Sequence, residues 1–104
     1  MAFERLIGLH VVDEAQYTRY REKMTPILSS YGGEFGYDLR VAEVLKSPLT
    51  DSPSLNRVFT IRFPTEETSQ AFFADTAYRD VRREHFENAV DQTTVMATYA
   101  PATD

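Results

Sequence analysis

The sequence contains no cysteine and no tryptophan, and only 4 of its 104 residues are glycine. Without cysteine, the chain forms no disulfide, no thiolate nucleophile and no cysteine-based zinc or iron–sulfur site. A basic excess is missing too, since 11 Lys and Arg against 16 Asp and Glu give a net charge of -5. A protein that coats nucleic acid needs a basic surface, so we expect no nucleic-acid partner.

Long hydrophobic runs are also missing. The longest apolar stretch, residues 6–12, includes a histidine and is far shorter than the 18 or more apolar residues of a membrane span. It follows Glu4 and Arg5, not the basic region of a secretion signal. We therefore expect no membrane association and a cytoplasmic location.

The composition that remains is that of a small globular domain. Hydrophobic residues make up 42% of the chain and charged residues 26%, which is typical of folded proteins rather than disordered ones. A length of 104 residues allows one domain. We place its core within residues 3–99 and treat residues 100–104 as a tail.

The hydrophobic pattern predicts six elements in the order strand, helix, strand, strand, helix, strand. The expected strands are residues 3–12, 34–45, 57–63 and 93–99. The expected helical regions are residues 13–31 and 64–90, and Asp75 begins a new helix inside the second region. The proline- and serine-containing segment 46–56 between the middle strands is expected to be a loop.

The first helical region carries clear start and stop signals. Asp13 is a good N-cap, and Gln16 three residues later completes a capping box. Pro26 predicts a kink or a division of the helix, and the pair Gly32-Gly33 predicts its end. One apolar face recurs at helical spacing. Its members are Tyr17, Tyr20, Met24, Ile27, Leu28 and Tyr31.

This element order predicts an α+β fold of the ferredoxin-like type, βαββαβ. Two interleaved βαβ units give a four-stranded antiparallel sheet with both helical regions on one face. In this arrangement we expect the first and third strands to be parallel central neighbours. The other sheet face is left uncovered, which favours a second copy of the chain as its partner.

Short motifs stand at three places along the chain: Asp13 with Tyr17 and Tyr20, then Tyr31-Gly32-Gly33, then Phe63-Pro64-Thr65 leading to Phe72 and Tyr78. These motifs resemble the family known as domain of unknown function 1330 (DUF1330), over roughly residues 5–99. The resemblance implies a ferredoxin-like fold that pairs sheet against sheet into a dimeric α/β barrel. The wider superfamily includes cofactor-independent monooxygenases, haem-degrading enzymes and lactone isomerases, but the family itself has no established reaction.

The chain departs from the family pattern at two positions and in one loop. Arg62 stands before the Phe-Pro pair, where the family usually has an acidic residue, and His85 stands where the family often has arginine. The loop of residues 47–55 also looks longer than is usual. If the family uses that acid and that base, the chemistry of this chain differs.

The first candidate site combines His10 and Arg62. We expect the apolar residues Phe59, Ile61 and Phe63 to face the helices. Since side chains alternate along a strand, Thr60 and Arg62 are then expected on the opposite face. With parallel pairing, His10 would lie beside Arg62, and the pair would invite an anionic ligand. In the alternative reading, Arg62 pairs with a carboxylate of a second subunit and His10 is an interface residue.

The second candidate site is the cleft between sheet and helices. His85, Tyr17, Tyr20 and Tyr78 lie on the apolar sides of the helical regions and can line this cleft. We keep Tyr17, Thr60 and Tyr78 as ligand-binding candidates and His10, Arg62 and His85 as catalytic candidates. Alternatively, the tyrosines are core residues with their hydroxyls at the rim, and His85 is a packing residue.

Three functions remain open. The first is a homodimer that binds a small organic or anionic ligand, with cofactor-independent catalysis as an extension. The second is a non-catalytic dimeric binding or scaffold module, and the third is a haem enzyme, which its colour would reveal. Two histidines without cysteine are poor evidence for a metal site. We therefore expect no metal and no cofactor.

Overall fold

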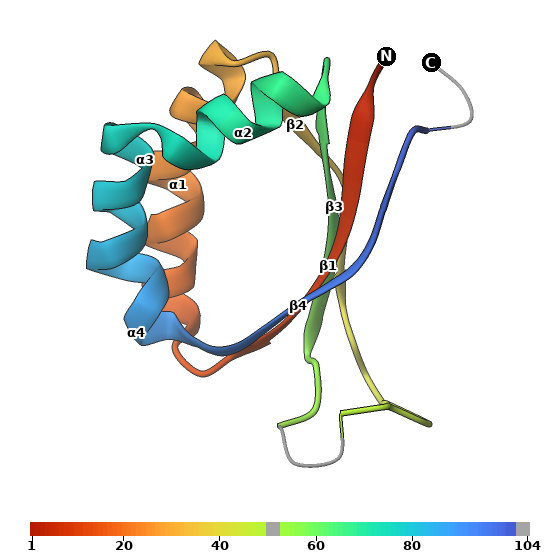
Figure 1. The fold of residues 1–104 in the computed structure, drawn as a ribbon. Helices are drawn as coiled ribbons and strands as arrows, with labels where there is room; N and C mark the ends of the chain where they lie inside the picture. Colours follow the sequence, from red (N-terminus) through yellow and green to blue (C-terminus); the bar gives the residue numbers. More distant parts are fainter. Residues whose placement is uncertain (50–52, 102–104) are drawn as a thin grey trace.

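The structure is a computed structural model that describes residues 1–49 and 53–101 (Figure 1). Its strands are β1 (Phe3–Val11), β2 (Glu34–Arg40), β3 (Arg57–Phe63) and β4 (Val90–Tyr99). The helices are α1 (Glu14–Ser30), α2 (Glu66–Ala74), α3 (Thr76–Val81), a π-helical turn η1 (Arg82–Phe86) and α4 (Glu87–Ala89).

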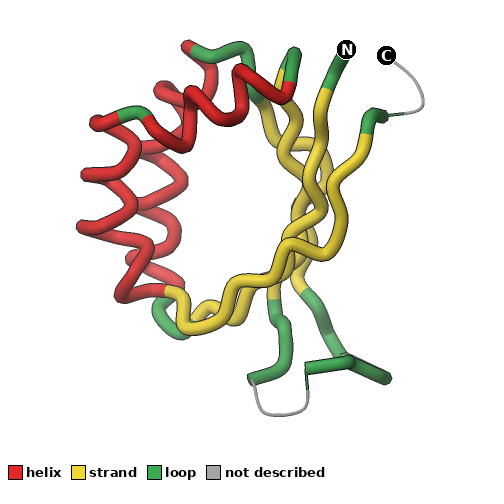
Figure 2. Tube along the Cα trace, in the orientation of Figure 1, coloured by secondary structure: helices red, strands yellow, loops and turns green. Residues whose placement is uncertain are grey.

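The four strands form one sheet in the order β2-β3-β1-β4, with antiparallel pairing throughout. All helices lie on one face of this sheet and leave the other face open (Figure 2). We call these the helix side and the open side. The predicted α+β, ferredoxin-like arrangement is confirmed.

One expectation about the sheet was wrong: β1 and β3 are antiparallel, not parallel. A crossover through α1 makes β2 run in the same direction as β1, and the connection of residues 41–56 then reverses the chain. β3 therefore runs against both of its neighbours. The start of β1 therefore lies beside the end of β3.

The core lies between the sheet and the helices. On β3, Phe59, Ile61 and Phe63 are buried against the helices, as the alternation predicted. On β1, Leu9 is fully buried on the same side. The remaining buried residues from the sheet and the helices include Ile7, Val11, Tyr17, Met24, Leu28 and Phe72.

A β-bulge interrupts β2 near the predicted bend. The pairing with β3 shifts between Phe35 and Asp38, so that two residues of β2 lie opposite one residue of β3. The Thr60 hydroxyl accepts a hydrogen bond from the Tyr37 backbone N–H at 2.8 Å. A Cβ on Gly36 would lie 2.5 Å from that hydroxyl, so only glycine fits the bulge. β2 ends at Arg40, five residues earlier than expected.

The signals around α1 act mostly as predicted. Asp13 Oδ1 accepts a hydrogen bond from the Gln16 N–H at 3.1 Å, and Gly32 ends the helix with φ at 75°. Pro26 lies inside the helix without dividing it. The reciprocal half of the capping box is not made, because the Gln16 side chain contacts His85 while the Asp13 N–H donates to Ala89.

We expect Asp13→Ala to lower the free energy of unfolding by about 1 kcal/mol, within the range of about 0.5–2 kcal/mol for loss of an N-cap. The cause is a helix N–H left without an acceptor. Denaturant unfolding measures the change, and Asp80→Ala, which removes an exposed carboxylate inside α3, serves as control. Equal stability of Asp13→Ala and wild type would show that Asp13 is not a stabilising cap.

Candidate functional site

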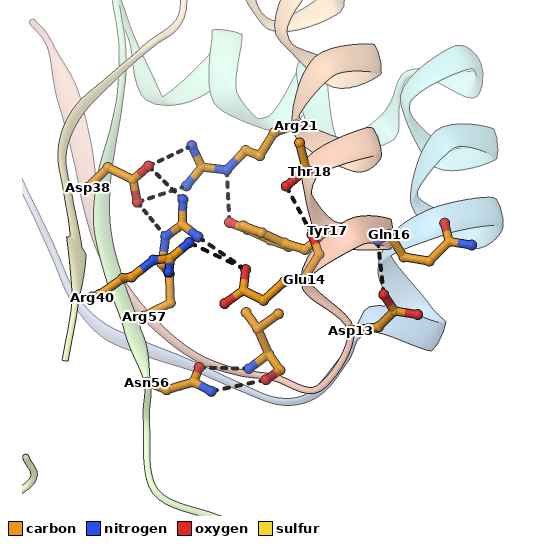
Figure 3. A network of polar contacts seen from close by, with 11 residues as sticks. Asp13, Glu14, Gln16, Tyr17, Thr18, Arg21, Asp38, Arg40, Asn56 and Arg57 are labelled. Atoms are coloured by element: carbon orange, nitrogen blue, oxygen red, sulfur yellow. Dashed lines mark hydrogen bonds and ion pairs between the residues drawn. The ribbon is translucent and has the colours of Figure 1, made fainter. Parts of the chain in front are cut away.

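A network of charged side chains joins α1 to β2 and β3 on the helix side (Figure 3). Asp38 accepts two hydrogen bonds from Arg57, at 2.8 Å and 2.9 Å, and two longer ones from Arg21, both at 3.4 Å. Glu14 lies 3.8 Å from Arg57 and 4.0 Å from Arg40. A single carboxylate thus bridges two arginines whose side chains are each only 16% exposed.

Aromatic rings hold both arginines in place. The Arg21 guanidinium carbon lies 3.8 Å from the centre of the Phe35 ring, and Arg57 lies 5.1 Å from the Tyr17 ring. Arg21 Nε also donates to the Tyr17 hydroxyl at 2.8 Å. With each arginine occupied by Asp38 and an aromatic face, the network fastens helix to sheet.

The pKa values in this network follow its contacts. The hydrogen bonds from Arg57 lower the pKa of Asp38, and the charge of Arg21 adds to this effect. Burial raises the pKa of Tyr17, against the opposing influence of Arg21. Near neutral pH the carboxyl is therefore ionised and the phenol is neutral.

A cavity of about 50 Å³ lies between the sheet and the helices, next to this network. Two tyrosine hydroxyls meet beside it, since Tyr20 Oη and Tyr78 Oη are 2.8 Å apart. Arg21 and Arg82 also line the cavity. Its walls are otherwise mostly apolar and include Met24, Phe35, Phe59, Phe73 and Phe86.

The tyrosine pair contributes neutral hydrogen-bonding groups to the cavity, beside the two arginines. Burial raises the pKa of Tyr20 well above its ordinary value, and the neighbouring Tyr78 hydroxyl adds to the rise. One hydroxyl of the pair donates to the other, so the pair keeps one further O–H that can act as a donor. The cavity is thus lined by aromatic side chains and has a hydroxyl donor at its edge.

His10 and Arg62 do not form a pair. Both side chains face the open side, because the residues before and after each of them in its strand are buried against the helices. Antiparallel pairing, however, places Arg62 opposite Glu4. Six positions along β1 separate Glu4 from His10, or about 20 Å at the rise of a strand. The shared site proposed for these two residues is therefore excluded by the direction of β3.

His10 instead pairs with Asp91 at the end of the sheet. The distance from its Nδ1 to Asp91 Oδ1 is 2.7 Å, and the two side chains are 27% and 49% exposed. A carboxylate only accepts hydrogen bonds, so His10 Nδ1 is the donor in this contact.

The other candidates have partners that fix local structure. His85 is buried, with Nδ1 2.8 Å from Gln16 Oε1 and Nε2 3.6 Å from Glu84. It belongs to the π-helical turn and does not line the cavity. Thr60 closes the β2 bulge on the open side. Tyr17 binds Arg21, and of the three sequence-predicted ligand-binding residues Tyr78 is the one that lines the cavity.

Sequence reasoning missed Arg21, Asp38 and Arg57. A signal for Arg57 was present, because it shares the alternation of Phe59 and Ile61 and so faces the helices. Arg21 follows Tyr17 by four residues, which places it on the same side of α1.

The open side carries a second and larger hollow, of about 430 Å³. The segment of residues 41–49 forms one wall, and Leu55 and Val58 form another. Met96 lies 3.2 Å from the position of a Cβ on Gly8, so its side chain crosses this face. Leu39 and Met96 are about half exposed, at 51% and 49%. The part of the open side around this hollow is therefore apolar and partly bare.

Two further properties concern the parts of the chain that the structure covers. Residues 1–49 and 53–101 contain no group of three or more His, Asp or Glu side chains arranged to hold a metal ion. No helix within these ranges is long and apolar enough to cross a membrane.

Four antiparallel strands, with helices on one face and the opposite face open, define a ferredoxin-like α+β protein. The model of the family described as domain of unknown function (DUF1330) matches residues 6–99, and the chain belongs to this family. No curated protein matches the chain.

Solved structures share the fold. A protein of unknown function from Rhodopseudomonas palustris has a TM-score of 0.81 at 16% identity, covering 99% of this chain and 84% of that chain. A dabb family protein with a ferredoxin-like fold from Mesorhizobium loti has a TM-score of 0.63 at 17% identity, covering 98% of each chain. A dimeric protein of unknown function and ferredoxin-like fold from Bacteroides fragilis has a TM-score of 0.64 at 7% identity, covering 95% of each.

Proposed function

We propose that the protein is a homodimer, joined through the open sides of two sheets, and that each protomer binds a small organic molecule between its sheet and helices. The observation that carries the binding proposal is the Tyr20–Tyr78 hydroxyl pair beside an aromatic cavity. Two buried phenols contribute one free donor, which fixes the orientation of a ligand.

The dimer proposal rests on the open side. Leu39, Val58 and Met96 share this face, and the apolar hollow of about 430 Å³ lies between them and the segment of residues 41–49. Bare apolar surface of this kind is stabilised when a second copy covers it. The Bacteroides fragilis protein, which has the same fold, is described as dimeric.

The size of the inner cavity limits the ligand. The space of about 50 Å³ is smaller than the ~150 Å³ that holds benzene in an engineered protein cavity. A ring-sized ligand therefore requires Arg21 or Arg82, which line the cavity, to move aside. Arg82 lies over the Phe86 ring at 4.6 Å and is the less restrained of the two, because Arg21 is also bound to Asp38.

A specific observation favours the alternative, a non-catalytic dimeric scaffold. Most sequence-predicted site residues have partners that fix local structure, among them Tyr17 with Arg21, Thr60 with Tyr37, Tyr78 with Tyr20, His85 with Gln16 and His10 with Asp91. Residues held in this way stabilise the fold without a ligand. A ligand titration separates the two functions.

The probe for this titration is phenol, a single ring with one hydroxyl, observed by NMR. We expect saturable binding to the wild type and about tenfold weaker binding to Tyr20→Phe and to Tyr78→Phe, which corresponds to the loss of one hydrogen bond. Tyr37→Phe is the matched control, because Tyr37 is 72% exposed. No saturable binding to the wild type at millimolar phenol would overturn the binding proposal and favour the scaffold.

A further inference from the structure

We propose that a hollow between β1, α2 and α3 binds the carboxylate or phosphate group of a small metabolite. The hollow has a volume of about 360 Å³ and is lined by Arg5, Gln70, Phe73, Ala74 and Arg79. In Figure 1, α2 runs from the end of β3 toward α3 across the helix side of the sheet. This hollow is separate from the proposed ligand cavity, although the Phe73 side chain lines both.

Arg5 is the centre of this site. It alternates with Ile7 and Leu9, so its side chain lies on the helix side of the sheet. The guanidinium carbon lies 4.8 Å from the centre of the Phe73 ring and 5.7 Å from that of Phe3. Packing against two rings restrains the guanidinium plane and leaves its N–H edge for polar partners.

The Arg5 guanidinium has no counter-charge among the described residues. Within residues 1–49 and 53–101, no carboxylate lies within 4.0 Å of Arg5 or Arg79, and Arg5 Nε is buried without a hydrogen bond. Arg21, Arg57 and Arg83, in contrast, each pair with an aspartate. A partly desolvated cation without a partner is costly, and an anion in the hollow would offset this cost.

The donors around the hollow define the class of ligand. Arg5 and Arg79 supply two positive charges from different elements, and the Gln70 amide supplies further N–H groups. Arginine forks match the paired oxygens of carboxylates and phosphates. The whole chain carries a net charge of -5, so the two cations are a local exception that favours an anion at this place.

The test uses inorganic phosphate and benzoate as separate probes at constant ionic strength. Binding is followed through the arginine Nε–Hε signals of the whole chain. We expect saturable binding of at least one probe, and at least tenfold weaker binding to Arg5→Met and to Arg79→Met. The control is Arg83→Met, because Arg83 is exposed and pairs with Asp80. Methionine keeps the apolar stem that packs on Phe73, so Arg5→Met is expected to fold, which unfolding curves verify.

The outcomes of these titrations distinguish a phosphate group from a carboxylate group, and they distinguish this site from the proposed phenol cavity. Phosphate binding alone assigns a phosphate group, benzoate binding alone assigns a carboxylate, and either supports the site. Binding of neither probe, or equal binding by wild type, Arg5→Met and Arg83→Met, overturns it. Binding that is retained in Tyr20→Phe and Tyr78→Phe shows that this site is independent of the phenol cavity, whichever way the phenol titration ends.

Discussion

Met96→Asp is expected to convert the protein from a dimer to a monomer at micromolar concentration. Met96 crosses the open side near Gly8 and Leu55, where the proposed partner covers it. An unpaired carboxylate in an apolar interface loses its hydration without compensation. Two-fold symmetry places the substitution in the interface twice. We expect the dissociation constant to rise at least about a hundredfold, which corresponds to about 2.7 kcal/mol.

Sedimentation velocity of the wild type and the variant measures this change. Asn88→Asp is the matched control, because it adds the same charge at an exposed position of α4 on the other side of the molecule. The side chain of Met96 is about half exposed in one protomer, so the fold itself is expected to remain, as far-ultraviolet circular dichroism verifies. A dimer that persists in Met96→Asp would place the interface elsewhere.

Asp38→Ala is expected to have the largest effect on stability among single polar substitutions, lowering the free energy of unfolding by about 2 kcal/mol. It removes the carboxylate that bridges Arg21 and Arg57. Hydrogen bonds to charged groups contribute about 1.5–3 kcal/mol, and partial exposure of Asp38 to water keeps the loss below that of a fully buried pair. Glu43→Ala, which removes an exposed carboxylate after β2, is expected to change stability little in the same denaturant measurement.

The pH dependence gives a second readout of Asp38. Its pKa is lowered in the folded state, chiefly by hydrogen bonds from Arg57. Its contribution is therefore fully present above the pKa of the unfolded chain, about 3.9, and is lost as the pH falls through the lower folded pKa. We expect the difference between wild type and Asp38→Ala to be constant from pH 7 to about pH 5 and to shrink below pH 4. A difference that grows on acidification would contradict the assigned ion pairs.

The fold could be predicted because local signals and the tertiary packing agree. β3 occupies residues 57–63 as expected, since its alternation of apolar residues is strict. Asp13 and Asp75 begin their helices through ordinary side-chain caps. The predicted direction of β3 relative to β1 was wrong. This direction depends on how often the chain reverses between the two strands, and no residue pattern within a strand indicates that number.

The charged network could not be predicted because it depends on the β2 bulge. Phe35 faces the helices opposite Ile61, and simple alternation would then turn Asp38 to the open side. The extra residue at Gly36 and Tyr37 reverses this alternation and brings Asp38 opposite Phe59, beside Arg21 and Arg57. The sequence predicted a bend at this place but carried no signal of its register.

Native mass spectrometry of the purified wild-type protein tests the central proposal most directly, because it reports assembly and bound molecules together. The proposal predicts a species of twice the 11.9 kDa of one chain, with added mass from a small organic molecule that is absent from Tyr20→Phe and Tyr78→Phe. A spectrum that contains only the unliganded chain at 11.9 kDa, under conditions that preserve a known dimer, would contradict both the dimer and the bound ligand.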